Sequence, residues 1–188
     1  LFFNMRRSAI FLDRDGVIIE NREDYVKSRN EVVFLPCALG ALQRIAKSEY
    51  LQFIVTNQSA VGRGIITLDQ AHAINQWVIA MVSSSGGRVD GSFLCPHHPD
   101  DDCRCRKPAP GLLLKAQNDF HIDFEQSFLI GDAASDIDAA QKVGARGILV
   151  LTGRGKHQLQ IMQSSGFRDF LVAPDLNAAV DLILTMEK

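Results

Sequence analysis

The sequence predicts an α/β protein with a mainly parallel central sheet and helices on both of its faces. Short apolar or β-branched segments alternate with longer amphipathic ones along the chain, which is the order that builds strand–helix–strand crossovers. Polar side chains follow several of the short segments directly, as expected where parallel strands end at a ligand-binding edge. With 188 residues and 46% hydrophobic content, the chain suits one domain over residues 1–188.

Six strands and six helices are expected in alternation. The strands are runs bounded by turn residues, in chain order Ala9–Leu12, Gln52–Thr56, Ser92–Cys95, Phe128–Ile130, Gly147–Leu151 and Asp169–Val172. The helices carry apolar residues at helical spacing, in chain order Cys37–Lys47, Leu68–Ser83, Gly111–Asp119, Ser135–Val143, His157–Ser164 and Leu176–Met186. Thr67, followed by Gln70, and Asp175 stand where helix caps are expected.

The net charge and the apolar runs of the chain indicate which ligands and which cellular location to expect. The formal net charge of −2 argues against broad nucleic-acid binding, so we expect a small ligand and no nucleic-acid partner. No apolar run is long enough to span a bilayer, and Arg6, Arg7 and Asp13 interrupt the apolar start before a signal-peptide core could form. We therefore expect a cytoplasmic protein without membrane contact. Separately, we expect the protein to be a monomer.

Two carboxylates follow the first expected strand. Asp13 and Asp15 stand two residues apart directly after it, and Gly16 then lets the backbone turn sharply. A carboxylate can attack phosphorus, and a hard cation such as Mg²⁺ neutralises the charge that would repel the attacking anion. The pair suits phosphoryl transfer, with Asp13 as the nucleophile and Asp15 as the proton carrier. An isolated Asp-x-Asp-Gly is also an ordinary turn, so the interpretation depends on partners elsewhere.

Candidate partners follow two other expected strands. Thr56-Asn57-Gln58-Ser59 comes after the second strand, and Gly131-Asp132 after the fourth. Because loops at the C-terminal ends of parallel strands emerge at one edge of the sheet, these side chains are expected to converge. The residues that we expect to share this crevice are Asp13, Asp15, Thr56, Asn57 and Asp132.

A cysteine cluster predicts a structural zinc site. The segment 95–105 contains Cys95, Cys103 and Cys105, with His97 and His98 between them. Three thiolates and one imidazole complete a tetrahedral zinc shell without an open position, and either histidine spacing closes it. Free cysteines beside incidental histidines are the alternative. Bound zinc would direct the next two cations, Arg106 and Lys107, toward the crevice.

Together these segments resemble the haloacid dehalogenase superfamily of phosphotransferases, whose four motifs are matched in chain order. Asp13-x-Asp15-Gly16 resembles the first motif, Thr56 the second, Lys107 the third, and Gly131-Asp132 with Asp136 the fourth. The resemblance runs from Ile10 to about Val150. It implies the three-layer Rossmann-like fold of that superfamily.

The resemblance also implies a role for each matched residue. The implied catalytic residues are Asp13, Asp15, Thr56 and Lys107, of which the last two hold phosphoryl oxygens. Mg²⁺ would bind the Asp13 side chain, the Asp15 backbone carbonyl and Asp132. The implied substrate-binding residues are Asp13, Arg14, Asp15, Thr56, Asn57, Gln58, Ser59, Arg106 and Lys107. Asp136 would orient Lys107 or a metal-bound water, or cap the following helix.

Within the superfamily, the zinc loop resembles that of the D-glycero-D-manno-heptose 1,7-bisphosphate 7-phosphatases and the similar histidinol phosphatases, which lack a large cap domain. Neither the interval 17–51 nor the interval 60–106 is long enough for an independent lid. The resemblance implies His97 as the fourth zinc ligand and Arg106 as the bidentate partner of a second phosphate. Residues Glu20 to Tyr25 occupy the place of the substrate loop, but they differ there in length and identity.

We therefore expect a Mg²⁺-dependent phosphomonoesterase of carbohydrate metabolism that removes the 7-phosphate of the heptose bisphosphate. Histidinol phosphate is the alternative substrate, because the same catalytic parts would serve it. A zinc-stabilised, non-catalytic binding module is the alternative from another class, although basic and aromatic residues do not cluster around the cysteines. Arg63, in a glycine-flanked loop, suits substrate contact and a solvated surface equally.

Overall fold

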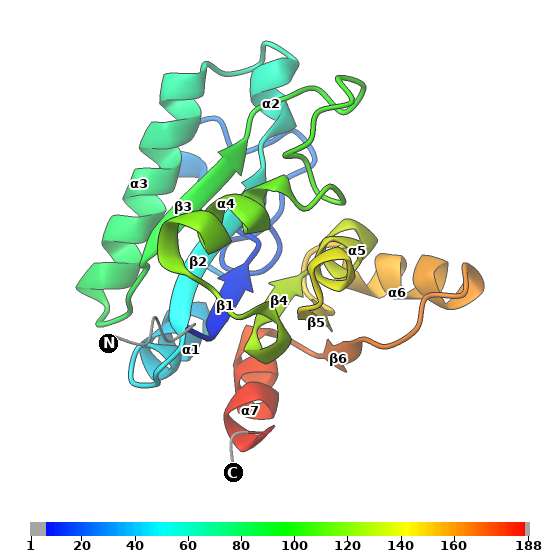
Figure 1. Cartoon of the computed structure of the whole chain (residues 1–188). Helices are drawn as coiled ribbons and strands as arrows, with labels where there is room; N and C mark the ends of the chain where they lie inside the picture. Colours follow the sequence, from blue (N-terminus) through cyan, green and yellow to red (C-terminus); the bar gives the residue numbers. More distant parts are fainter. Residues whose placement is uncertain (1–6, 187–188) are drawn as a thin grey trace.

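A six-stranded parallel sheet forms the middle layer of the structure, a computed structural model that describes residues 7–186 (Figure 1). Its strands are β1 (Ala9–Leu12), β2 (Leu51–Asn57), β3 (Gly91–Cys95), β4 (Phe128–Gly131), β5 (Arg146–Val150) and β6 (Leu171–Ala173). They lie in the order β3-β2-β1-β4-β5-β6. Because successive strands are added on opposite sides of β1, the sheet has a switch point between β1 and β4, where a crevice opens at the C-terminal strand ends.

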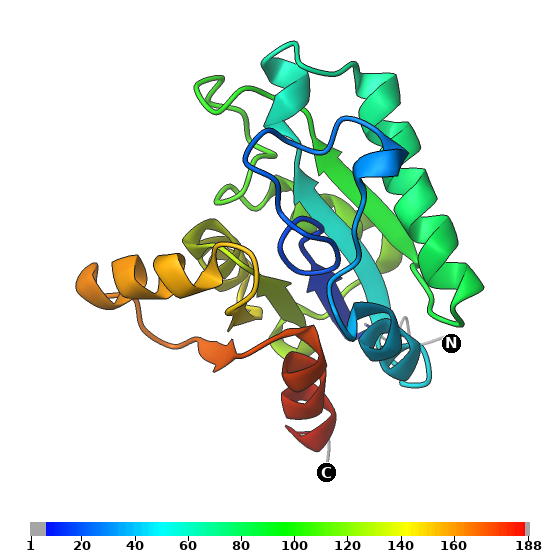
Figure 2. The ribbon, with the colours of Figure 1, turned by 180° about the vertical axis from the view of Figure 1, so that it is seen from behind.

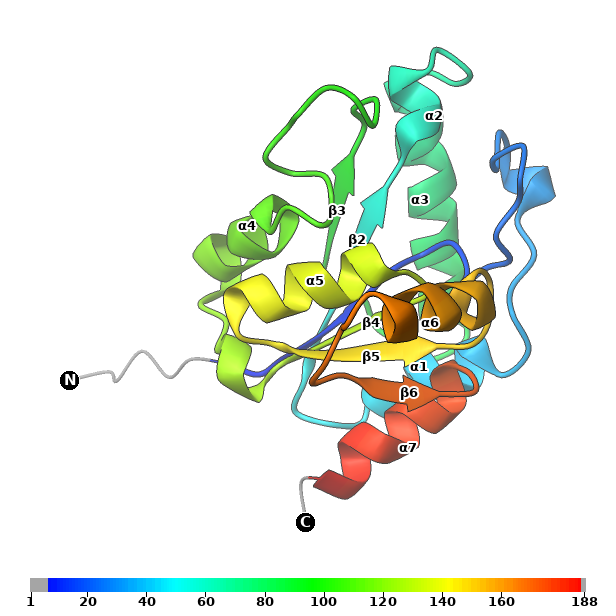
Figure 3. The ribbon, with the colours of Figure 1, turned by 90° about the vertical axis from the view of Figure 1, so that its right-hand side faces the viewer.

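Helices cover both faces of the sheet (Figure 3). One face carries α1 (Ala38–Ile45), α3 (Leu68–Ser84) and α7 (Leu176–Met186). The other carries α4 (Gly111–Phe120), α5 (Ala134–Val143) and α6 (Gly155–Ser164). A short helix, α2 (Ser59–Gly62), follows β2, and two 3-10 turns lie at Arg29–Glu31 and Phe124–Gln126. The arrangement confirms the expected three-layer α/β fold.

The central strand β1 is buried on both faces. Ile10 and Leu12 pack into the apolar cluster of α1, α3 and α7, whereas Ala9 and Phe11 pack into that of α4 and α5. This alternation follows from the two-residue period of a strand. The two cores fix the end of β1 and with it the direction in which the following residues leave the sheet.

All twelve expected elements are present, and two of them, Ala9–Leu12 and Leu176–Met186, have the expected bounds; the other ten are shifted at one or both ends. The sixth strand was expected at Asp169–Val172 but begins at Leu171, because Asp169 has a φ of 60°, which an extended ladder does not accommodate. Helix α1 likewise begins after Cys37, whose φ is 64°. The expected cap at Thr67 is confirmed as a capping box with Gln70. Asp175 accepts a hydrogen bond from the Ala178 N–H over 2.8 Å, as a cap does.

The segment after β1 takes a long route before α1 begins. It loops over the C-terminal end of the sheet and descends along the helix-α1 face (Figure 2). All named strands of residues 7–186 belong to one sheet, which agrees with the expected lack of a large cap domain. Over the same residues, no helix combines the length and apolar character needed to cross a bilayer. The predicted interruption of the apolar start at Arg6 lies outside the described residues.

Candidate active site and metal centres

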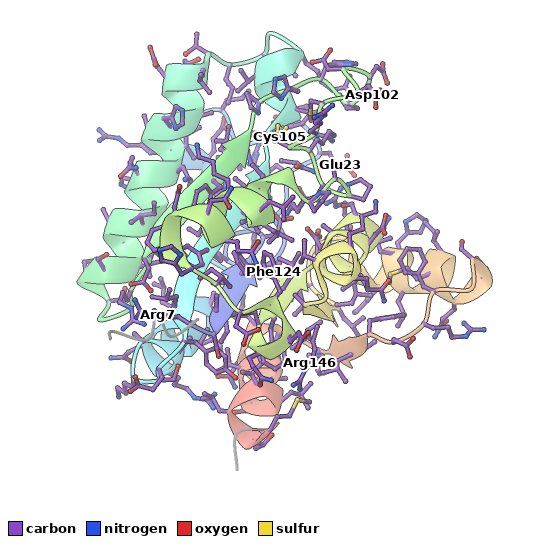
Figure 4. All side chains as sticks on the ribbon, in the orientation of Figure 1. Arg7, Glu23, Asp102, Cys105, Phe124 and Arg146 are labelled. Carbon is purple, nitrogen blue, oxygen red and sulfur yellow. The ribbon has the colours of Figure 1, made fainter. Side chains whose placement is uncertain are left out.

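A pocket of about 780 Å³ opens at the C-terminal edge of the sheet. Residues at or after the C-terminal ends of strands β1 to β5 form its walls. The lining residues are Asp13, Asp15, Asn21, Arg22, Glu23, Tyr25, Val26, Asn57, Gln58, Ser59, Arg63, Pro99, Arg106, Lys107, Pro108, Ser135 and Arg154. Figure 4 places Glu23 and Cys105 at this end of the molecule, and Arg7 and Arg146 at the other. The pocket therefore lies where a parallel sheet with a switch point binds ligands.

Asp13 stands at the floor of the pocket, directly after β1. The Arg14 N–H donates to Asp13 Oδ1 over 2.8 Å, and Lys107 Nζ lies 3.1 Å from the same oxygen. Burial raises the pKa of the Asp13 carboxyl to about 7, against the lowering effect of Lys107, and the neighbouring carboxyls of Asp136, Asp132 and Asp15 raise it further. A divalent cation would favour the ionised form that acts as a nucleophile.

Lys107 is a buried cation with three oxygen partners. Its Nζ donates to the Val55 carbonyl over 2.6 Å and lies 2.6 Å from Asp136 Oδ1, besides its contact with Asp13. Burial lowers the pKa of Lys107, but the charges of Asp13 and Asp136 outweigh it and raise that pKa above its ordinary value. The ammonium therefore stays charged beside the Asp13 carboxylate.

Asn57 positions the backbone of Lys107. The Asn57 Nδ2 donates to the Lys107 carbonyl over 3.0 Å, and the Lys107 N–H donates to Asn57 Oδ1 over 3.1 Å. Both ends of the amide are thereby engaged. Asn57 lines the pocket, but in this arrangement it aligns the third motif with the end of β2.

Asp15 is held by hydrogen bonds from two side chains. Arg14 donates through Nε to Asp15 Oδ2 and through Nη2 to Oδ1, each over 3.1 Å. Gln58 Nε2 donates to Asp15 Oδ2 and to Thr56 Oγ1, both over 2.8 Å. This network orients one carboxyl at the pocket wall, beside the buried Asp13, as a two-step proton carrier requires.

Three carboxyl groups form a candidate Mg²⁺ centre. Oxygens of Asp13, Asp132 and Asp136 lie within 4.8 Å of one another. An all-oxygen, buried donor set fits Mg²⁺. A Cβ on Gly16 or Gly153 would collide with the Asp132 carboxyl, so these two glycines shape the cradle in which Asp132 lies. The Asp15 carboxyl is not part of this group, and its expected contribution was the backbone carbonyl.

Asp136 combines two of the tasks that the sequence left open. One of its oxygens forms the ion pair with Lys107, and Oδ2 accepts a hydrogen bond from the Ala133 N–H over 3.1 Å, at the start of α5. Asp136 therefore orients Lys107 and caps the helix at the same time. Gly131 leaves it room, because a Cβ there would collide with the Asp136 side chain.

The cysteine cluster has the geometry of a zinc shell. Cys95 Sγ lies 3.6 Å from Cys103 Sγ and 3.2 Å from Cys105 Sγ, and His97 Nδ1 lies 3.5 Å from Cys95 Sγ. Tetrahedral ligands of zinc stand roughly 3.5 to 3.8 Å apart, given Zn–S bonds of about 2.3 Å, so the cluster has this spacing except at Cys105, whose Sγ lies 3.2 Å from Cys95 Sγ and from His97 Nδ1. Burial raises the pKa of the Cys95 thiol to about 12, a penalty on the thiolate that a bound cation would remove. The four residues fit Zn²⁺.

Of the two histidines, only His97 lies in the cysteine cluster among the described residues. The Nδ1 of His97 belongs to the cluster, whereas the Nδ1 of His98 accepts from the Asp100 N–H over 3.2 Å. Glycines in α2 and α4 let the loop pack tightly, because a Cβ on Gly62 would collide with the backbone at His98 and one on Gly111 with that at Arg104. The loop is thereby fixed against both helices.

The structure brings most of the predicted site residues to the pocket wall and buries three beneath it. Asp13, Asp15, Asn57, Gln58, Ser59, Arg106 and Lys107 line the pocket. Arg14, Thr56 and Asp132 are at most 1% exposed and do not line it. Arg14 and Thr56 contact the wall through Asp15 and Gln58.

Sequence reasoning missed Arg154 and left Arg63 undecided, and both line the pocket. Arg154 donates from its backbone N–H to Asp132 Oδ2 over 2.9 Å, and its Nη2 lies 3.0 Å from Asp132 Oδ1. Burial raises the pKa of Asp132, and the hydrogen bonds and charge of Arg154 lower it. The signal was available, because Thr152-Gly153-Arg154 follows the fifth strand at the edge where the other loops converge.

Comparisons with known proteins match nearly the whole chain. A D-glycero-beta-D-manno-heptose-1,7-bisphosphate 7-phosphatase of Pseudomonas aeruginosa is 34% identical over 180 residues, 96% of this chain and 99% of that protein. The crystal structure of the D,D-heptose 1,7-bisphosphate phosphatase from B. bronchiseptica, complexed with magnesium and phosphate, is similar with a TM-score of 0.88 and 34% identity, covering 95% of this chain and 99% of that one.

Two further matches agree with these. The D,D-heptose 1,7-bisphosphate phosphatase from Burkholderia thailandensis has a TM-score of 0.73 and 29% identity, covering 95% of this chain and 99% of that one. The model of the HAD-hydrolase-like family matches residues 104–179. This range contains Lys107, Asp132 and Asp136, which are the third and fourth motifs of the sequence.

Proposed function

Because this chain belongs to the haloacid dehalogenase-like hydrolases, in the family of the heptose bisphosphate phosphatases, we propose that it is a Mg²⁺-dependent phosphomonoesterase. The observation that carries the proposal is the placement of Asp13 at the pocket floor, 3.1 Å from the buried Lys107 ammonium and next to Asp132. A nucleophile, a fixed cation and a metal-binding carboxyl converge there, as phosphoryl transfer requires.

Asp13 is the nucleophile in this proposal. The Arg14 N–H and Lys107 both contact Oδ1, so we assign the attack on phosphorus to Oδ2. A bond forms between Oδ2 and phosphorus while the bond from phosphorus to the leaving oxygen breaks, which leaves a phosphoaspartate. Asp15 protonates the leaving alkoxide, then takes a proton from the water that hydrolyses the phosphoaspartate. One carboxyl thus acts first as acid and then as base.

Fixed charges would stabilise the transferring group. Lys107 supplies a cation whose position is set by Val55 and Asp136. The Thr56 hydroxyl accepts its hydrogen bond from Gln58, so its own proton can be donated toward a phosphoryl oxygen. Because Asp136 is engaged by Lys107 and the Ala133 N–H, Mg²⁺ would be held by Asp13, Asp132 and the Asp15 carbonyl, where it would neutralise charge on the phosphate and favour ionised Asp13.

The proposed substrate is D-glycero-D-manno-heptose 1,7-bisphosphate, with removal of the 7-phosphate. The names of the relatives and two basic pocket residues support this choice. Arg106 Nη1 is buried without a hydrogen-bond partner among the described residues, and Arg106 lines the pocket with Arg63. A second phosphate would satisfy Arg106 through paired N–H donors. Histidinol phosphate has no second phosphate, so Arg106 would remain unpaired.

Phosphate release tests the reaction and the substrate together. The heptose bisphosphate and histidinol phosphate are compared in Mg²⁺ buffer, with the Asp13→Asn variant measured beside the wild type. We expect turnover of the bisphosphate and none by Asp13→Asn, whose circular dichroism spectrum and zinc content should match the wild type. Preference for histidinol phosphate would reject the substrate, and substantial Mg²⁺-dependent turnover by a folded Asp13→Asn would remove Asp13 from the nucleophile role.

Other expectations from the sequence accompany the proposed activity. The single domain over residues 1–188, the monomeric state and the cytoplasmic location stay predictions, as does the absence of nucleic-acid and membrane partners. Each suits an enzyme that acts on a small phosphorylated sugar. Sedimentation of the purified protein would test the monomer directly.

A further inference from the structure

Arg154, on the loop between β5 and α6, occupies both oxygens of Asp132. Its Nη2 lies 3.0 Å from Oδ1, its Nε donates to Oδ2 over 3.3 Å, and its backbone N–H donates to Oδ2 over 2.9 Å. Asp132 itself is fully buried. The steps proposed for the reaction give Arg154 no task, although it lines the pocket.

The Arg154 guanidinium and a divalent cation would compete for the carboxylate oxygens of Asp132. A cation bound there needs at least one of the two oxygens, and a positive guanidinium within hydrogen-bond distance would repel it. Only Nη2 contacts Oδ1 among the described residues, whereas Oδ2 also receives the backbone N–H. Oδ1 is therefore the oxygen that withdrawal of the side chain would release.

Charge balance favours an exchange of these cations. Asp13, Asp132 and Asp136 bring three negative charges to the cluster when ionised, and Lys107 and Arg154 bring two positive ones. One negative charge is left over in a buried region, which is unfavourable. A divalent cation in place of the Arg154 guanidinium would make the cluster neutral.

The two cations differ in their freedom to move. The side chain of Lys107 is 1% exposed, whereas that of Arg154 is 54% exposed. The main chain around Arg154 is anchored independently, because Thr152 Oγ1 donates to the Gly16 carbonyl over 2.6 Å and the Arg154 N–H donates to Asp132. The side chain can therefore leave Asp132 while its loop stays in place.

We propose that Arg154 acts as a stand-in cation, which neutralises Asp132 in the metal-free protein and moves into the pocket when Mg²⁺ binds. The released guanidinium then contacts the phosphate group at Asp13, for which its planar pair of donors is suited. This inference rests on the proposed Mg²⁺-dependent function. It makes Arg154 weaken metal binding and strengthen phosphate binding, a combination that a purely structural residue would not produce.

The test measures two affinities by calorimetry without turnover. Mg²⁺ is titrated into the zinc-loaded wild type and into Arg154→Gln, and inorganic phosphate is then titrated into each at saturating Mg²⁺. Lys156→Gln is the matched control, because it removes the same charge two residues away at an exposed position that does not line the pocket. We expect Arg154→Gln to bind Mg²⁺ about 3- to 10-fold more tightly and phosphate at least about 3-fold more weakly. Lys156→Gln should match the wild type in both.

The outcomes separate this inference from the proposed function. Equal or weaker Mg²⁺ binding by Arg154→Gln, or unchanged phosphate binding, would overturn the role of Arg154 alone. Failure of the wild type to bind Mg²⁺ would overturn the proposed function together with it. Should Arg154→Gln fail to fold, Arg154→Lys replaces it, and we expect tighter Mg²⁺ binding there too, because a lysine cannot hold both Asp132 oxygens at once.

Discussion

Asp13 is a carboxyl group buried among three others, and its burial links proton binding to folding. Its pKa of about 7 in the folded protein lies above the value of about 4 for an exposed aspartate. The folded state therefore binds a proton more readily than the unfolded state. This contribution to stability is fully present below about pH 4 and is lost as the pH rises through about 7.

Stability without Mg²⁺ should accordingly fall between pH 5 and pH 8, and Asp13→Asn should remove part of that fall. Asparagine has the same shape and no charge, so we expect the variant to gain about 1–3 kcal/mol in free energy of unfolding at pH 8 and little at pH 5. Urea unfolding at both pH values measures this, in Mg²⁺-free buffer without a chelator so that zinc is retained. If Asp13→Asn changed the free energy of unfolding equally at the two pH values, ionisation of Asp13 would not be coupled to stability.

The positions of single site residues could be predicted where a sequence motif gives the residue one chemical role. Asp13 and Lys107 meet as the motif order implied, because both loops end at the same sheet edge. The use of the Asn57 amide to hold the Lys107 backbone depends on two chain segments packed in a particular register, and no local pattern encodes that. Arg154 was missed because none of the four matched motifs covers the loop after the fifth strand, from which Arg154 contacts Asp132.

The cysteine loop is best considered as one element, and we expect it to help position Arg106 and Lys107, which follow it directly. The four residues that would bind zinc lie within residues 95–105, and the two cations follow directly. The loop is irregular and carries few apolar side chains of its own, so metal coordination would supply the order that a core cannot. Its close packing against Gly62 and Gly111 then transmits that order to α2 and α4.

Cys103→Ser tests this dependence. We expect loss of zinc and a fall in kcat/KM of about 10- to 100-fold, because a cation displaced by about 1 Å stabilises the phosphoryl group poorly. Zinc content and phosphate release measure the two effects. Cys37→Ser is the matched control, since Cys37 is an exposed thiol outside the cluster, and it should retain both zinc and rate. A zinc-free Cys103→Ser with unchanged turnover would refute the positioning role.

Elements were predictable in type and less so in extent. Each strand was predicted because the residues that pack on one or both faces of the sheet form an apolar run, which can be recognised in the sequence. Two of the boundary errors occur where one residue adopts a left-handed conformation, namely Asp169 before β6 and Cys37 before α1. Helix α2 has only four residues, too few for a periodic pattern to indicate it.

At the scale of the whole molecule, the pocket is a product of topology. Its walls come from loops that are far apart in sequence, and the order of the parallel sheet brings them to one edge. The motifs predicted this convergence because strand direction alone decides it. The contribution of Asn21, Arg22 and Tyr25 to the pocket lining was not predictable in detail, because the long loop that carries them has no periodic pattern.

A ligand bound across this edge should protect distant segments from hydrogen exchange together. With Mg²⁺ and inorganic phosphate at 100 times their dissociation constants, we expect exchange governed by local opening to slow by up to about 100-fold. The protected segments should be 13–26, 57–63, 104–108, 132–135 and 152–154, because all contribute to the pocket or its metal-binding groups. Segments 86–90 and 144–145 precede strands at the opposite edge and should exchange as before. Exchange followed by mass spectrometry resolves these segments in one experiment, and protection confined to a single loop would contradict a site built by the whole sheet.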